Sequence, residues 1–320
     1  MDIKYILDNF YPIVKIVKSM PPELQSLPWE TLYAREAGLL AASEKILFSR
    51  FLRVDNYRPA VRLRREALDV SLAVAAPEGL KSYNLPTPEA ASIANSLRGA
   101  VGEDRLRLVP ATRRGVLKTL RDGAGILCLA AHGAFPRGSR EPFVFLAGER
   151  GEVARVRAAD LADDLASLDR LPRLIVLLSC YSGGSDAALG SPDEALLSLG
   201  AQLVTRGAPA VVAIRGSISF ATAGQFLASF FAELRRDWVI DRALGAARRD
   251  ILERQDAWAP VLFMRLADGW LARPTALQAT FAPPPLPPDY VHRPAAHEAV
   301  VERLLLGTES DEPHRFDFLN

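Results

Sequence analysis

The sequence predicts an α/β domain with a mainly parallel central sheet and helices on both faces. Several short runs of apolar and β-branched residues, clearest at 125–131, 174–179 and 210–214, contain almost no polar side chain. Longer segments with helical spacing of apolar residues separate these runs. Strands that are apolar throughout are typical of a parallel sheet buried on both faces, and their alternation with helices indicates one α/β core.

The elements follow one another regularly along the chain. A strand is expected at 68–75, and Thr87 or Pro88 with Glu89 opens the first helix of the core. A further strand at 143–146 forms a hairpin across the turn at 148–151. The other expected strands are 106–110, 125–131, 174–179, 210–214 and 260–266, and the other expected helices are 113–121, 158–168, 194–206, 221–234 and 241–255.

Three parts of the chain differ in composition. We expect residues 1–60 to form a helix and short strands that pack on the core. Residues 61–272 are expected to form the core itself. The run of prolines at 283–288 suits neither a helix interior nor a central strand, so 273–320 is read as an extended linker followed by one amphipathic helix at 295–306. One helix cannot bury its own apolar face, so it either docks back on the core or is followed by another domain.

Composition excludes several classes of function. The formal net charge is +1 over 320 residues, so no global field favours nucleic acid or an anionic membrane. Neither a signal peptide nor an apolar run long enough to cross a bilayer is found. With only Cys128 and Cys180, and three of the four histidines in the tail, we expect no disulfide framework, metal site or other cofactor. These features predict a cytoplasmic protein.

Two strand ends carry residues suited to catalysis. His132-Gly133 follows one apolar run, and Cys180 follows another, 48 residues later. Because ligands bind where the carboxyl ends of parallel strands meet, both side chains should emerge at one edge of the sheet. A thiolate nucleophile needs a base, and the imidazole can take the thiol proton and return it to the leaving amine. The amides of Gly133 and Cys180 would then form an oxyanion hole.

A structural role must be weighed against this catalytic one. Cysteine is often a small buried hydrophobe, which is our interpretation of Cys128, and a His-Gly pair at a strand end is often structural. One observation favours catalysis, because His132 is the only histidine before residue 292 and therefore the only candidate base in the core.

The ordered motifs between about residues 20 and 272 resemble those of the CHAT family. The segment LPWETLY at 27–33 is similar to the family's N-terminal motif, RGAPAVVA at 206–213 to a strand entry, and WAPVLF at 258–263 to its closing strand. The resemblance implies a caspase-like sandwich and a Cys180–His132 dyad in a cysteine endopeptidase that cleaves a protein substrate. Relatives in this clan are held inactive until they are activated, so we expect a latent enzyme.

The sequence departs from similar sequences at two positions. Leu178 lies two residues before the cysteine, where metacaspase-like enzymes that cut after Arg or Lys have an acidic residue, so the resemblance does not imply a preference for a basic P1 residue. Arg215 replaces a residue that is uncharged in many similar sequences. It is either a substrate ligand for a carboxylate or, the interpretation we favour, a surface arginine in a loop. Asp186 either lines the cleft or caps a turn.

The tail indicates a partner. Residues 287–293 followed by a helix resemble the segment before the nucleotide-binding domain of STAND-type signalling ATPases, although His292 replaces a glycine. We therefore expect an effector module that acts with such a sensor, in cis or in trans, in bacterial signalling or defence. The chain has no phosphate-binding motif of its own.

Two other classes of protein remain as alternatives. One is a catalytically silent caspase-like scaffold, which the intact dyad positions disfavour. The other is a nucleotide-binding or cofactor-binding domain, but residues 73–79 contain a single glycine and a proline instead of a glycine-rich loop.

Overall fold

The computed structural model describes most of the predicted core. The described residues are 13–16, 27–35, 38–43, 46–52, 63–64, 69–83, 90–135, 141–178, 195–215, 218–266 and 269–273. All of them belong to a compact unit, Met1–Thr275, and none to the second unit, Ala276–Asn320. Apart from Arg273, the predicted linker and tail helix at 273–320 therefore lie outside the described residues, and the domain boundaries stay a prediction.

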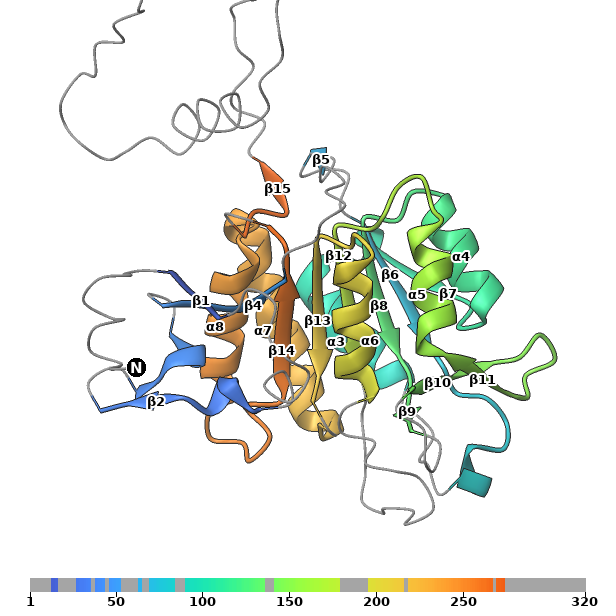
Figure 1. The fold of residues 1–320 in the computed structure, drawn as a ribbon, viewed down its shortest axis with the longest axis horizontal. Helices are drawn as coiled ribbons and strands as arrows, with labels where there is room; N and C mark the ends of the chain where they lie inside the picture. The colour runs from blue at the N-terminus through green and yellow to red at the C-terminus, as the bar shows by residue number, and fades with distance from the viewer. Residues whose placement is uncertain are drawn as a thin grey trace, which may run out of the picture. The chain divides into compact units, whose positions relative to one another are not determined.

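A central eight-stranded sheet organises the described chain (Figure 1). All neighbouring strands in it are parallel except β13 and β14, which are antiparallel. Every residue of β8, β12, β13 and β14 is buried, as a sheet covered on both faces requires. In sheet order the strands are β1 (Ile13–Ile16), β4 (Leu47–Phe51), β14 (Pro260–Met264), β13 (Ala210–Ile214), β12 (Leu174–Leu178), β8 (Ile126–Ala130), β6 (Val70–Val74) and β7 (Leu106–Val109).

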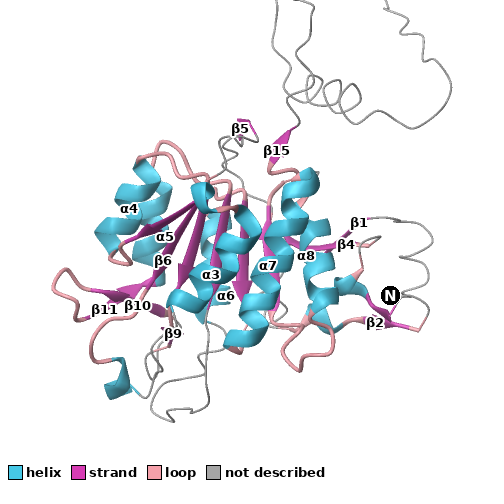
Figure 2. Ribbon diagram, turned by 180° about the vertical axis from the view of Figure 1, so that it is seen from behind, coloured by secondary structure: helices cyan, strands magenta, loops and turns pink. Residues whose placement is uncertain are grey.

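Helices cover both faces of this sheet (Figures 1 and 2). On one face α3 (Ala90–Val101), α7 (Phe220–Asp237) and α8 (Ile240–Asp250) pack against Cys128 and its alternate neighbours in the strands. On the other face α4 (Arg113–Arg121), α5 (Ala158–Ala166) and α6 (Ala195–Thr205) pack against Leu127 and Leu129. The predicted layered α/β fold is confirmed. The helix expected at 241–255 ends earlier, at Asp250.

A small antiparallel sheet lies beside the end of β8. It contains β9 (Gly133–Ala134), β10 (Phe143–Ala147) and β11 (Val153–Arg157), in the order β11-β10-β9. The rings of Phe143 and Phe145 lie 4.9 Å apart, and Phe145 also packs on Tyr83, at the end of η4 (Leu80–Tyr83), with ring centroids 5.0 Å apart. The hairpin at 143–157 was expected, but β9 is too short to leave a sequence pattern.

The N-terminal segment is built of short elements that reach the sheet. Trp29–Thr31 (η1), Tyr33–Ala34 (β2), Gly38–Leu39 (β3) and Leu40–Ala42 (η2) precede β4. Strand β4 pairs with β14, and β1 pairs with β4, so this segment extends the central sheet beyond β14. The remaining short elements are β5 (Leu63–Arg64), which pairs with β15 (Ala272–Arg273), and η5 (Glu103–Arg105). Within the described ranges, no helix combines the length and apolar character needed to span a membrane.

Candidate active site

His132 lies two residues beyond the end of β8, between the central sheet and β9. Three backbone hydrogen bonds hold this short segment. The amide of Ala75 donates to the carbonyl of Ala130 (2.8 Å), the amide of Ala131 to that of Leu178 (2.9 Å), and the amide of Phe145 to that of His132 (2.9 Å). Strands β6, β12 and β10 therefore fix the backbone that carries His132, whose side chain is only 3% exposed.

The register between β8 and β12 relates His132 to Cys180. In this parallel ladder Ala130 lies opposite Leu178, and these two residues are separated by the same 48 positions as His132 and Cys180. Each candidate residue thus follows a registered partner by two residues. Neighbouring strands lie about 4.8 Å apart, and side chains alternate between faces with a period of two. Equal offsets from a registered pair favour a contact between the two side chains, which stays a prediction because Cys180 lies outside the described residues.

Gly133 is placed so that its amide points away from the hairpin. In the antiparallel pair Val144 lies opposite Gly133, and the amide of Phe145 donates to the carbonyl of His132. His132 and Phe145 therefore form a hydrogen-bonded pair, and Gly133 and Val144 the next, non-hydrogen-bonded pair. The N–H of Gly133 is directed to the side of β9 opposite β10, as an oxyanion donor must be.

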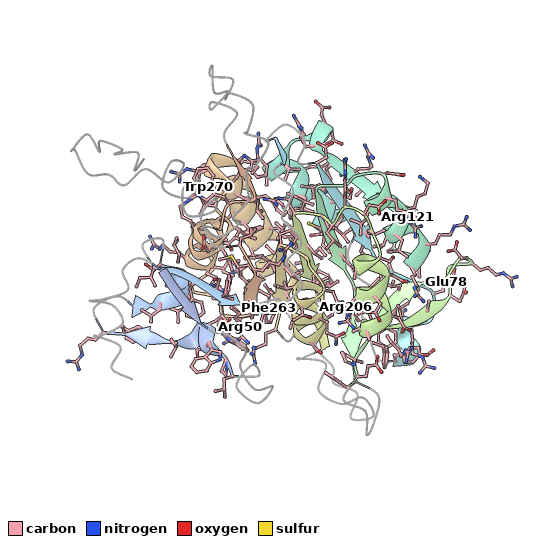
Figure 3. The ribbon with its side chains drawn as sticks, turned by 45° about the horizontal axis from the view of Figure 1, so that its top comes forward. Arg50, Glu78, Arg121, Arg206, Phe263 and Trp270 are labelled. Carbon is pink, nitrogen blue, oxygen red and sulfur yellow. The ribbon has the colours of Figure 1, made fainter. Side chains whose placement is uncertain are left out.

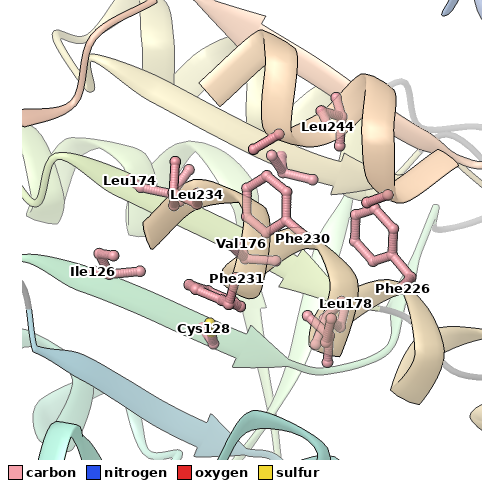
Figure 4. Close-up of a cluster of buried hydrophobic side chains, with 14 of the residues drawn as sticks. Ile126, Cys128, Leu174, Val176, Leu178, Phe226, Phe230, Phe231, Leu234 and Leu244 are labelled. Atoms are coloured by element: carbon pink, nitrogen blue, oxygen red, sulfur yellow. The ribbon is translucent and has the colours of Figure 1, made fainter. Parts of the chain in front are cut away.

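Cys128 is a core residue, as the sequence predicted. Its side chain is fully buried among Ile126, Val176 and Phe231 of the cluster under α7 (Figure 4). Burial raises the pKa of its thiol well above the ordinary value. A buried thiol that keeps its proton is neither an accessible nor an activated nucleophile.

Two of the predicted site residues are not described. Cys180 and Asp186 both lie between 179 and 194, outside the described part of the chain. Their roles stay predictions. The candidates that the structure describes are His132 and Gly133, which follow β8, and Arg215, which follows β13.

Arg215 follows directly after β13, at the same edge of the sheet as His132. The favoured interpretation of a surface arginine is wrong, because its side chain is only 8% exposed. Its Nη2 donates to the carbonyl of Leu27 (3.1 Å), and its backbone amide donates to the carbonyl of Ala259 (2.7 Å). The contact with Leu27 joins residues 188 positions apart, and no local pattern in the sequence predicts it.

A family model of the CHAT domain matches residues 9–289. The chain belongs to the CHAT family. The predicted membership is thus confirmed, and this CHAT domain has the caspase-like α/β sandwich that membership implies.

No curated protein sequence matches this CHAT domain. Among solved structures it is similar to the Arg-specific cysteine proteinase gingipain R, with 13% sequence identity and a TM-score of 0.41. The match covers 72% of this chain and 56% of the proteinase chain, so the chain spans little more than half of that protein's length.

Proposed function

We propose that this CHAT domain is a cysteine endopeptidase in which Cys180 is the nucleophile and His132 the general base and acid. The observation that carries the proposal is the register of β8 and β12, which gives His132 and Cys180 equal offsets from the pair Ala130 and Leu178. In the proposed site, hydrogen bonds from three neighbouring strands hold the backbone that carries His132. The imidazole therefore starts from an ordered backbone when it takes the proton.

The proposed reaction uses these groups in sequence. His132 takes the thiol proton, and the sulfur of Cys180 attacks the carbonyl carbon of a peptide bond. The resulting oxyanion accepts hydrogen bonds from the amides of Gly133 and Cys180. When the C–N bond breaks, His132 returns the proton to the leaving amine. Water, deprotonated by His132, then hydrolyses the thioester and releases the second product and the thiol.

We propose that the enzyme is latent until it is activated. A peptide bond must come within hydrogen-bond reach of the imidazole, and the burial of His132, which is only 3% exposed, supports a latent state. In this proposal a STAND-type sensor, in cis or in trans, drives the activating rearrangement during bacterial signalling or defence. The buried thiol Cys128 offers no alternative nucleophile, because its proton is retained.

A peptide-library digest tests this function. The purified chain, alone and after enforced dimerisation through a fused dimerisation domain, would be incubated with a proteome-derived peptide mixture, and new termini would be identified by mass spectrometry. We expect a consistent cleavage motif that is absent from Cys180→Ala. Cleavage that persists in Cys180→Ala would refute the dyad. The absence of new termini in both states would instead favour a silent scaffold.

A further inference from the structure

A buried set of charged side chains connects the N-terminal segment to the central sheet. The carbonyl oxygen of Leu27 accepts a hydrogen bond from Nη2 of Arg215 (3.1 Å) and another from Nη2 of Arg50 (2.9 Å). Arg50 is held in turn by Glu30 through Nε (2.8 Å) and Nη2 (2.6 Å). We call Leu27, Glu30, Arg50 and Arg215 the Leu27 clamp.

Burial makes the geometry of the Leu27 clamp specific. Glu30 and Arg50 are 1% and 4% exposed, and the guanidinium of Arg50 lies over the ring of Phe263 in β14, 5.6 Å from its centroid (Figure 3). A buried charge that loses its partner is strongly destabilising, so such groups stay in the arrangement that pairs them. The carbonyl of Leu27, a residue that is itself exposed, therefore accepts a hydrogen bond from an arginine that is buried and paired.

The Leu27 clamp reaches the edge of the sheet where His132 lies. Strands β12 and β13 are parallel, with Leu177 opposite Ala213. Arg215 follows Ala213 by two residues, at the carboxyl end of β13. Strands β8, β12 and β13 are parallel, so this end lies at the same edge of the sheet as His132, and in the sequence Cys180 follows Leu177 by three residues toward that edge.

The side chain of Arg215 belongs to the other face of the sheet from that of His132. Val211 and Ala213 pack on the face covered by α5 and α6, and alternation continues this face to Arg215. Cys128 and Ala130 pack on the α3 and α7 face, which alternation continues to His132. Arg215 is thus suited to act through the backbone and through Leu27, instead of by contact with a substrate in the dyad.

We propose that Arg215 is a positioning residue of this endopeptidase, which holds the end of β13 through the Leu27 carbonyl at the edge of the sheet that carries His132. The inference rests on the proposed function, and it makes the segment Leu27–Glu30 part of the active-site support. It also replaces the expectation that Arg215 binds a carboxylate of the substrate.

Arg265 provides a matched control. It lies at the opposite end of the same strand pair and is similarly buried, at 9% exposed. Its Nε donates to the carbonyl of Gly207 (3.0 Å), and its amide donates to the carbonyl of Pro209 (3.1 Å). Loss of either arginine removes a buried guanidinium from β13 or β14, but only Arg215 lies at the catalytic edge.

The experiment compares Arg215→Met, Arg215→Lys and Arg265→Met in the full chain. All measurements are made at a temperature at which each variant is folded. Steady-state kinetics would use a peptide from the library digest, and the rate of Cys180 alkylation by iodoacetamide at pH 7 would be followed by peptide mapping. Because a displacement of about 1 Å costs roughly 10²-fold, we expect Arg215→Met to lower kcat about 10²-fold with little change in KM. Arg215→Lys, which keeps a donor, should recover part of the loss.

The alkylation rate provides a second readout that needs no peptide substrate. Separation of the thiol from His132 reduces the thiolate to a few per cent at pH 7, so alkylation of Cys180 should slow about tenfold in Arg215→Met but not in Arg265→Met. Equal effects of the two methionine variants on kcat and on alkylation would overturn the inference. A raised KM confined to acidic peptides would overturn it in favour of substrate binding. If the wild-type chain cleaves no peptide, the proposed function fails, and the alkylation rates still decide the role of Arg215.

Discussion

The amide of Ala131 donates to the carbonyl of Leu178 at 2.9 Å, which joins β8 to β12 at the ends where His132 and Cys180 follow. This bond is the last of the parallel ladder and closes the registered pair Ala130 and Leu178. The chain directions and the register at this edge are therefore fixed up to one residue before His132.

Exchanging the two cysteines for alanine separates catalysis from packing. We expect Cys180→Ala to abolish peptide cleavage with an unchanged melting temperature. Cys128→Ala should keep the activity but lose roughly 1 kcal/mol of stability, since it leaves a small void under α7. Cleavage rates and urea denaturation would be measured on both variants. Equal loss of activity with equal loss of stability would point to a folding defect and would undo the assignment of Cys180.

The buried thiol of Cys128 predicts a specific pH dependence of stability. Burial raises its pKa in the folded state, so only the unfolded state loses the proton above the ordinary thiol pKa. The wild-type chain should therefore lose stability relative to Cys128→Ala as the pH rises, by about 2 kcal/mol between pH 7 and pH 10. Urea titrations at the two pH values measure this difference. A difference that does not vary with pH would show that the thiol ionises in the folded state.

Replacement of Gly133 by proline tests the oxyanion donor. Proline removes the N–H, and Gly133 occupies a non-hydrogen-bonded position of a terminal strand, where the loss breaks no bond to β10. We expect kcat to fall about 10²–10³-fold with a small change in stability, whereas Gly133→Ala, which keeps the N–H, should lose much less. An alanine variant as inactive as the proline variant would indicate that backbone freedom, and not the donor, is required.

The pair formed by Glu30 and Arg50 should dominate the stability of the N-terminal segment. Glu30→Ala leaves a buried guanidinium without its carboxylate and should cost about 3–5 kcal/mol. The double substitution Glu30→Met with Arg50→Met should recover much of this loss. Asp122→Ala removes the exposed partner of Lys118 and should change stability by less than about 0.5 kcal/mol. If Glu30→Ala behaves like Asp122→Ala in urea denaturation, the buried pair does not hold the Leu27 clamp together.

Truncation locates the end of the folded core. Arg173 donates to the carbonyls of Leu271 (2.8 Å) and Trp270 (3.3 Å), and β15 pairs with β5. A chain that ends at Thr275 should therefore keep its melting temperature. A chain that ends at Leu266 leaves the buried Arg173 without these acceptors and should lose about 1–3 kcal/mol or more. Aggregation of the chain that ends at Thr275 would show that the tail helix predicted at 295–306, which this chain lacks, covers an apolar face of the core.

The sequence predicted the parts of this fold that depend on local pattern. The apolar runs at 125–131 and 174–179 specify buried parallel strands, and their spacing places His132 and Cys180 at corresponding positions. The burial of Arg215 could not be predicted, because it depends on the carbonyl of a residue 188 positions away. The bond from Phe145 to His132 was missed for a similar reason, since β9 has only two residues and acquires its structure by pairing with β10.

The pH dependence of Cys180 alkylation tests the proposed dyad most directly. Iodoacetamide reacts with the thiolate, so the rate at Cys180, mapped by mass spectrometry, reports its ionisation, while Cys128 stays unmodified in the folded chain. With His132 as partner, we expect a midpoint below the ordinary thiol pKa of about 8.5, and a return to about 8.5 in His132→Ala. The same ordinary midpoint in both proteins would contradict the assignment of Cys180 and His132 as a catalytic pair.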